Sequence, residues 1–200
     1  MSSNKTDTRT RILDAAWNLL ESSGGPAVRM GDIAKAAGIS RQAVYLHFPT
    51  RADLLTATAR HIDDAKGVDG RLATSRAATD GAERLDAFIE AWGNYIPEIH
   101  GVARALMAAA DSDPAAAEAW ADRMAALRQG CEAAVAALKK DGLLAPGLPP
   151  RQATDLLWTL LSVRNWEQLV GDAGWPQKRY VAAMKTTARR SLTTLADGPT

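Results

Sequence analysis

The chain lacks several features that mark large classes of proteins. Its 200 residues include a single cysteine, Cys131, which excludes an internal disulfide and fits a reducing compartment. The longest nearly apolar run covers about residues 156–163, far short of the ~20 residues that span a bilayer. The N-terminal stretch MSSNKTDTRTR contains no apolar segment, so no signal peptide is expected. These absences predict a cytoplasmic protein that has no membrane segment.

Motifs of the common enzyme classes are absent as well. The sequence contains no His-Glu-x-x-His, no Gly-x-Ser-x-Gly and no Cys-x-x-Cys. His61 is followed by Asp63 and Asp64, a group able to bind a metal, but a solvated helix face is the favoured interpretation. We therefore predict no catalytic residue, no metal site and no cofactor.

The chain also lacks a large net charge, although its charged residues are unevenly distributed. Residues 1–60 contain 8 Lys/Arg and 5 Asp/Glu, a balance of +3, while residues 61–200 contain 16 and 18, a balance of −2. A mildly basic front segment fits contact with phosphates but does not establish it. The hydrophobic content of 46% is enough for a substantial core, which argues against global disorder.

What the sequence does contain is helical periodicity along its whole length, with no segment typical of a strand. We predict an all-α protein of about nine helices. The first covers residues 8–22, and the region 66–81 reads as the end of the fourth helix and a loose connection. Pro97 is expected to break a helix. Later helices are expected up to about Lys140, from Pro149-Pro150 to Gly171, and after Gly174-Trp175-Pro176.

The segment IAKAAGISRQAVYLHFPTRADLL, residues 33–55, carries the clearest signal. Gly38 suits the left-handed position that ends a helix, and Ser40 is a good N-cap for the next one. Val44 and Phe48 lie four residues apart and can bury one face of that second helix. Thr50 with Asp53 three residues later predicts a capping box at the next helix. Two short helices around a tight turn are typical of a helix-turn-helix that reads the DNA major groove.

The same segment resembles the DNA-binding motif of the TetR family of bacterial transcription regulators. The family pattern is an Ile-Ala pair, Gly-(Val/Ile)-Ser, Tyr-x-His-Phe, a basic residue, and Asp/Glu-Leu-Leu, and every part is present within residues 33–55. The match covers roughly residues 8–60, and beyond it only length and helical layout agree. The resemblance implies a helix-turn-helix domain at residues 1–50 and a helical effector-binding and dimerisation domain at residues 51–200.

Candidate DNA contacts follow from the motif and the resemblance. Arg41 and Gln42 open the reading helix and carry forked groups that suit guanine and adenine edges. Tyr45, His47 and Arg51 are expected to hold phosphates, whereas a plain solvated surface is the less favoured interpretation. The full set of predicted contacts with double-stranded DNA is Arg29, Met30, Gly31, Ser40, Arg41, Gln42, Ala43, Tyr45, His47 and Arg51.

The last two expected helices carry apolar residues on more than one face, which fits either a buried core or a subunit interface. The resemblance favours the interface, since TetR-like proteins dimerise through their last two long helices. A two-fold homodimer also matches a palindromic operator. The candidate interface residues are Val163, Trp166, Val170, Met184 and Leu192.

Six tryptophans in 200 residues make the central helices unusually aromatic. Ordinary core packing is the favoured account of any one of these residues, and a pocket for a hydrophobic or aromatic small molecule is the functional alternative. The resemblance raises the expectation of an effector pocket, for which the candidates are Trp92, Tyr95, Met107, Trp120, Met124, Leu127 and Trp158.

Together these features predict a ligand-responsive, TetR-like transcription regulator, which is usually a repressor in this family. The alternative is an all-helical small-molecule carrier or enzyme that retains a vestigial helix-turn-helix. Binding to a specific DNA sequence would separate the two.

Overall fold

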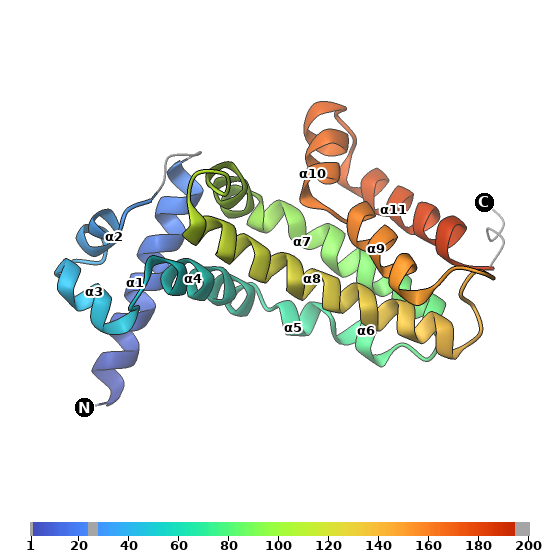
Figure 1. Ribbon diagram of the computed structural model, residues 1–200, viewed down its shortest axis with the longest axis horizontal. Helices are drawn as coiled ribbons and strands as arrows, with labels where there is room; N and C mark the ends of the chain where they lie inside the picture. The colour runs from blue at the N-terminus through green and yellow to red at the C-terminus, as the bar shows by residue number, and fades with distance from the viewer. Residues whose placement is uncertain (1, 24–27, 195–200) are drawn as a thin grey trace. The chain divides into compact units, whose positions relative to one another are not determined.

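The computed structural model describes residues 2–23 and 28–194, and the regular elements in this part of the chain are helices (Figure 1). An isolated bridge between Leu144 and Thr193 is the only β-type pairing among the described residues. The all-α prediction is therefore confirmed. The helices are α1 (Ser2–Ser23), α2 (Met30–Ala36), α3 (Arg41–His47), α4 (Arg51–Ala65), α5 (Val68–Arg71), α6 (Ala73–Ala77), α7 (Gly81–Ala109), α8 (Pro114–Lys140), α9 (Pro150–Leu160), α10 (Val163–Trp166), the π-helical η1 (Glu167–Asp172) and α11 (Gln177–Leu192).

Packing divides the chain into two compact units. The first unit comprises residues 1–67 and 99–124, and the second comprises residues 68–98 and 125–200. The expected domain boundary near residue 50 falls inside the first unit, because α4 packs against α1. Both α7 and α8 contribute residues to each unit.

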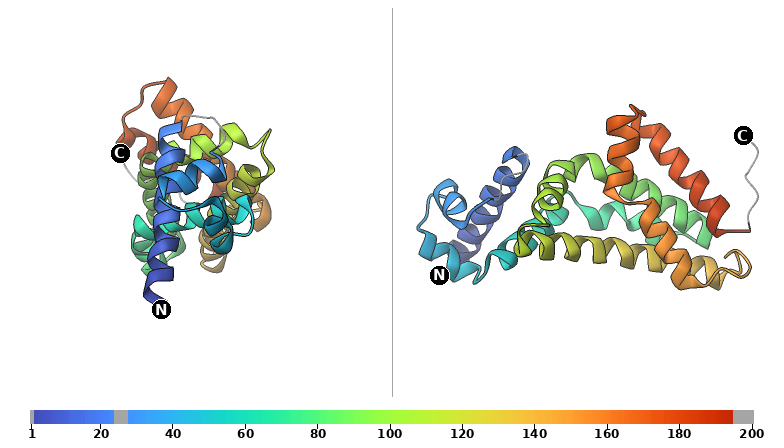
Figure 2. Two further views of the ribbon diagram at one scale, coloured as in Figure 1. Left: turned by 90° about the vertical axis from the view of Figure 1, so that its left-hand side faces the viewer. Right: turned by 45° about the horizontal axis from the view of Figure 1, so that its top comes forward.

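The core of the first unit forms where α1, α2, α3 and α4 bury their apolar faces. In α1 the apolar residues recur at helical spacing, so that Ile12, Ala16 and Leu20 all point inward. Leu54 and Leu55 of α4 are fully buried against this layer. Figure 2 shows α2 and α3 beside α1, and α1 also packs on α4. The Gly-Gly-Pro stretch at residues 24–26, just beyond the expected end of the first helix at residue 22, lies outside the described residues.

The expected break at Pro97 is wrong, because α7 runs through it from Gly81 to Ala109. Proline lacks the N–H that would bond to the carbonyl four residues earlier, here that of Gly93. Another helix supplies the missing donor: Gln177 Nε2 of α11 donates to the Gly93 oxygen at 2.7 Å. Gln177 is held in turn by Trp166, whose Nε1 donates to Gln177 Oε1 at 2.9 Å. This relay gives a donor to the carbonyl that the proline leaves without one.

Two other expected boundaries also differ from the structure. The connection expected at residues 66–81 contains the short helices α5 and α6. The single helix expected from Pro150 to Gly171 is divided into α9, α10 and η1, because Ser162 caps a new helix by accepting a hydrogen bond from the Asn165 amide. The described residues therefore contain more helices than the nine expected.

No helix among residues 2–23 and 28–194 has the length and apolar character needed to cross a membrane. Within the same residues, no group of three or more His, Cys, Asp or Glu side chains is arranged to hold a metal ion. Cys131 is buried, and loss of hydration raises the pKa of its thiol to about 12.

Candidate nucleic-acid interface

The helix-turn-helix is formed by α2, a tight turn and α3, each with a local cause. Gly38 has φ +68°, the left-handed conformation that glycine adopts without strain, and it ends α2. Ser40 starts α3 by accepting a hydrogen bond from the Ala43 amide at 3.1 Å. The turn chemistry predicted for Gly38 and Ser40 is confirmed.

The helix α3 buries one face and presents the other to solvent. Val44 and Phe48, four residues apart, are 0% and 2% exposed and anchor the helix to the core. The outward face carries Arg41, Gln42, Tyr45 and Leu46, and Leu46 is 79% exposed. A short, firmly anchored helix with a polar outer face matches the shape and chemistry of a reader of base edges.

Two of the candidate contacts on α3 pair with each other. Arg41 Nη2 donates to the Tyr45 hydroxyl at 3.3 Å, and the guanidinium lies 5.7 Å from the centroid of the Tyr45 ring. The spacing of four residues places both side chains on one face of the helix. Their contact orients the guanidinium along that face before any DNA is bound.

The start of α2 lacks the side-chain cap that begins α3 and α4. Arg29 occupies its N-cap position with an extended backbone, but its side chain makes no capping hydrogen bond. Arg29 and Gly31 are exposed, whereas Met30 is 5% exposed and packs in the core. Of these three candidate contacts, Met30 can therefore offer DNA only its backbone.

The remaining candidates occupy the end of α3 and the start of α4. Ala43 and His47 are half-buried, and Ser40 is exposed. The predicted capping box is confirmed: Thr50 Oγ1 accepts from the Asp53 amide at 3.0 Å, and Asp53 Oδ2 accepts from the Thr50 amide at 3.0 Å. Arg51 is engaged internally, with Val28 and Asp113 as its partners. Phosphate binding by Arg51 would require these contacts to open.

Sequence reasoning identified the local signals of this site but missed its long-range partners. Asp113 was recognisable only as the N-cap of the helix at Pro114, and nothing in the sequence paired it with Arg51, 62 residues away. The exposure of Leu46 was predictable from its position roughly opposite the buried Val44 on the helix, and its side chain is 79% exposed.

The candidate effector residues are distributed over both units. Trp92, Tyr95, Leu127 and Trp158 belong to the second unit, and Met107, Trp120 and Met124 belong to the first. In the second unit Tyr95 is 4% exposed and Trp92 is half-buried, with its Nε1 donating to the Leu161 carbonyl at 2.7 Å. Their rings lie 6.1 Å apart, so these aromatics pack on one another.

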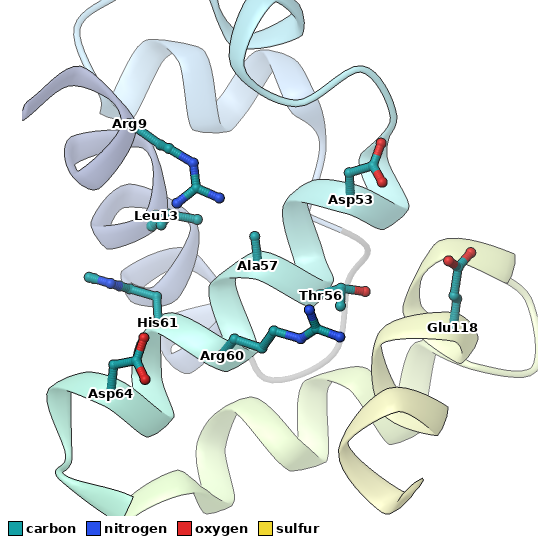
Figure 3. Close-up of a pocket in the computed structure, with 9 residues that line it drawn as sticks. All are labelled: Arg9, Leu13, Asp53, Thr56, Ala57, Arg60, His61, Asp64 and Glu118. Carbon is teal, nitrogen blue, oxygen red and sulfur yellow. The ribbon is translucent and has the colours of Figure 1, made fainter. Parts of the chain in front are cut away.

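A pocket of about 440 Å³ lies elsewhere, within the first unit between α1, α4 and α8 (Figure 3). Figure 3 shows Arg9 reaching in from α1, Arg60 from α4 and Glu118 from α8. None of the candidate effector residues lines it, and its charged lining differs from the apolar chemistry expected of the effector site. Its lining is Arg9, Leu13, Asp53, Thr56, Ala57, Arg60, His61, Asp64 and Glu118.

The candidate interface residues also divide into two kinds. Val163, Met184 and Leu192 are 1%, 4% and 1% exposed, and so pack inside the protomer. Trp166 and Val170 are half-buried and retain surface. On α9, Leu156 is 48% exposed, which sequence reasoning did not single out. Leu156 thus lies on the solvent-exposed side of α9, a helix that also packs against α11.

Comparison with known proteins places this geometry in context. Residues 12–58, which cover most of α1 and all of α2 and α3, match the family model described as bacterial regulatory proteins, tetR family. The chain is 30% identical over 188 residues to the HTH-type transcriptional repressor LfrR of Mycolicibacterium smegmatis, covering 94% of this chain and 92% of LfrR.

Solved structures share the fold over nearly the whole chain. A transcriptional regulator from Saccharomonospora viridis, solved in complex with choline, is 21% identical with a TM-score of 0.72 and covers 95% of this chain and 100% of its own. NalD, the secondary repressor of the MexAB-OprM multidrug efflux pump in Pseudomonas aeruginosa, is 24% identical with a TM-score of 0.68, covering 96% and 98%.

Proposed function

The chain belongs to the TetR family of bacterial transcription regulators, and from this premise we propose that it is a repressor released from a palindromic operator by a small, mostly apolar effector. The observation that supports DNA reading most directly is the outer face of α3, where Arg41, Gln42, Tyr45 and Leu46 are all exposed on a helix fixed by Val44. A buried anchor and a polar reading face are what entry into the major groove requires.

In the proposed complex Arg41 and Gln42 contact base edges, while Tyr45 and His47 contact phosphates. Arginine pairs with guanine O6 and N7 through two hydrogen bonds, and glutamine pairs with adenine N6 and N7 in the same way. The contact between Arg41 and Tyr45 supports this division, since the phenol lies where it can steady the guanidinium that reads the base. Arg29 and Gly31, exposed at the start of α2, are proposed to contact the phosphate backbone.

We propose that two copies assemble through α9, α10, η1 and α11, with Leu156, Trp166 and Val170 at the interface. A two-fold dimer presents two copies of α3 to half-sites one helical turn, ~34 Å, apart. Effector binding would alter their separation, and only an effector that prefers the DNA-free form can release the operator.

Selection of duplexes from random-sequence DNA by the purified protein tests the proposed function. A repressor is expected to enrich an inverted repeat whose half-sites are one turn apart. The alternative, an all-helical carrier or enzyme with a vestigial helix-turn-helix, predicts no enrichment of any sequence. A selected sequence without two-fold symmetry would retain DNA binding but contradict the dimer.

Gln42→Ala is expected to relax base preference at one position of each half-site. The substitution removes the two hydrogen bonds to an adenine edge, which corresponds to about 1–3 kcal/mol of discrimination at that position. The measurement is competition binding with operators changed at single positions. The matched control is Lys35→Ala, at an exposed position on α2 outside the reading face. An unchanged preference profile for Gln42→Ala would remove Gln42 from direct readout.

Lipophilic and aromatic compounds are expected to release the operator and to raise the melting temperature of the free protein. A ligand that binds only the folded state stabilises it by mass action, so the rise should grow with concentration. The screen should include choline, the ligand of the Saccharomonospora viridis relative. A compound that stabilises the protein without weakening operator binding fills a cavity but is no inducer. Release by polar metabolites alone would contradict an apolar effector.

A further inference from the structure

Three helix starts meet at the side chain of Arg51. Arg51 is the first residue of α4, immediately after the corner that follows the reading helix. Its Nε donates to the carbonyl oxygen of Val28, just before α2, at 2.8 Å. Its Nη1 forms an ion pair with the carboxylate of Asp113, the residue that precedes α8. One guanidinium thus joins the beginnings of α2, α4 and α8.

This junction of Val28, Arg51 and Asp113 is largely removed from water. The side chains of Arg51 and Asp113 are 21% and 15% exposed, so their attraction is screened less than that of a surface pair. The second carboxylate oxygen of Asp113 accepts from the Ala115 amide at 3.1 Å, which fixes the carboxylate to the first turn of α8. Asp113 is therefore oriented from one side by α8 and from the other by Arg51.

The start of α2 depends on this junction more than the neighbouring helices do. Ser40 caps α3 and Thr50 caps α4, but the N-cap residue of α2, Arg29, contributes no side-chain hydrogen bond. The segment that leads into α2 is held instead at the Val28 carbonyl, by a guanidinium that belongs to α4. A planar guanidinium can bond to a carbonyl and a carboxylate in different directions at once, which an ammonium does less well.

Further ion pairs keep α4 and α8 in the same register beyond the junction. Arg60 Nη2 lies 2.6 Å from Asp122 Oδ1, and Arg123 pairs with both Asp63 and Asp122. The partners of Arg51 and Arg60 are each 62 residues later in the chain, so the two helices run in parallel alignment. The hydrogen bond from Arg60, together with the charge of Arg123, lowers the pKa of Asp122 and keeps it ionised.

We infer that Arg51 and Asp113 are positioning residues for DNA recognition: Asp113 orients Arg51, and Arg51 holds the start of α2 in register with the corner between α3 and α4. The inference rests on the proposed function, since it concerns the geometry in which α2 and α3 meet DNA. It replaces the sequence-based expectation that Arg51 anchors a phosphate, because the charge of Arg51 is already matched by Asp113.

Asp113→Asn is the central variant, because asparagine caps a helix as well as aspartate does but carries no charge for Arg51. It is compared with Arg51→Gln, Arg51→Lys, the double variant Arg51→Gln/Asp113→Asn, and the control Arg76→Gln. Arg76 pairs with Asp69 in an exposed contact of the second unit, so the control removes an ion pair of the same type elsewhere. The probe is a fluorescent duplex selected by the wild-type protein, and affinity is measured at several salt concentrations.

A positioning role predicts that Asp113→Asn and Arg51→Gln each weaken binding by about tenfold or more, as expected for loss of a hydrogen bond to a charged group. The slope of log affinity against log salt should stay that of the wild type, because no phosphate contact is lost. The double variant should bind no more weakly than the worse single variant, and Arg51→Lys should not restore affinity. Circular dichroism at the assay temperature confirms that each variant is folded.

A phosphate anchor predicts the opposite pattern and would overturn the inference. Arg51→Gln would then lower the salt slope by about 1, Arg51→Lys would bind like the wild type, and Asp113→Asn would bind more tightly. If Asp113→Asn bound the duplex as tightly as the wild type does, the inference would be overturned as well. Hydrogen exchange provides a readout that needs no DNA: amides of residues 28–36 should exchange faster in Asp113→Asn, while unchanged exchange contradicts the inference. If the wild-type protein selects no duplex, the proposed function is contradicted. Hydrogen exchange in Asp113→Asn still tests whether the junction holds the start of α2.

Discussion

Met184→Glu is expected to unfold the second unit. Met184 is 4% exposed, on the inner face of α11 together with Tyr180, Ala188 and Leu192, so a carboxylate there would be buried without a partner. An uncompensated buried charge costs about 3–5 kcal/mol, a large part of the ~5–15 kcal/mol that stabilises a typical domain. The measurement is chemical denaturation followed by circular dichroism. The expected result is a lower denaturation midpoint and a fall in helical content compared with the wild type.

Met184→Leu is the matched control, because it nearly conserves volume and should cost less than ~1.5 kcal/mol. The sequence alone predicted a different result for Met184→Glu, namely a folded monomer, since it placed Met184 at the subunit interface. The burial of Met184 within the protomer overturns that expectation. A stable, fully helical monomer would show that the residue faces a partner after all.

Leu156→Glu is expected to give a folded monomer with greatly reduced operator affinity. Leu156 is 48% exposed in a single protomer, so a glutamate is tolerated there as long as the subunits are apart. Buried between two copies, the same carboxylate would lose its hydration without gaining a partner, once in each subunit. Loss of the dimer removes the second half-site contact, and avidity of this kind contributes about 10²–10⁴ in affinity. Analytical ultracentrifugation and anisotropy measure the two effects.

Ala136→Glu provides the control for added charge, because Ala136 is exposed on α8 in the same unit. It should remain dimeric and bind the operator like the wild type. A Leu156→Glu protein that is still a dimer at micromolar concentration would exclude α9 from the interface. A wild-type protein that sediments as a monomer would contradict the dimer altogether.

The helix-turn-helix was predictable because its determinants are neighbours in the chain. The positive φ of Gly38, the Ser40 cap and the capping box at Thr50 each involve residues within three or four positions, and each choice has one simple physical reason. Helical periodicity likewise identified Val44 and Phe48 as the buried face of α3. These features do not depend on which distant segment packs nearby.

Properties that depend on distant partners were not predictable in this way. Apolar periodicity indicates that Met184 is buried, but it cannot tell whether a protomer core or a second subunit buries it. The ion pair of Arg51 with Asp113 joins residues 62 positions apart, and each of the two has a plausible local role. Pro97 carries a strong local signal for a break, but α7 continues through it, with buried residues around the proline and a hydrogen bond from Gln177 to the Gly93 carbonyl.

That hydrogen bond makes the folding of two helices interdependent. Proline within a helix costs about 3 kcal/mol relative to alanine, so an isolated α7 is expected to break at Pro97. Its carbonyl at Gly93 gains a donor only when α11 has docked and Trp166 holds Gln177 in place. The middle of α7 and the start of α11 should therefore open and close as one cooperative unit, protecting their amides together. The middle of α7 therefore gains this donor only after α11, near the C-terminal end of the chain, has been synthesised and has docked.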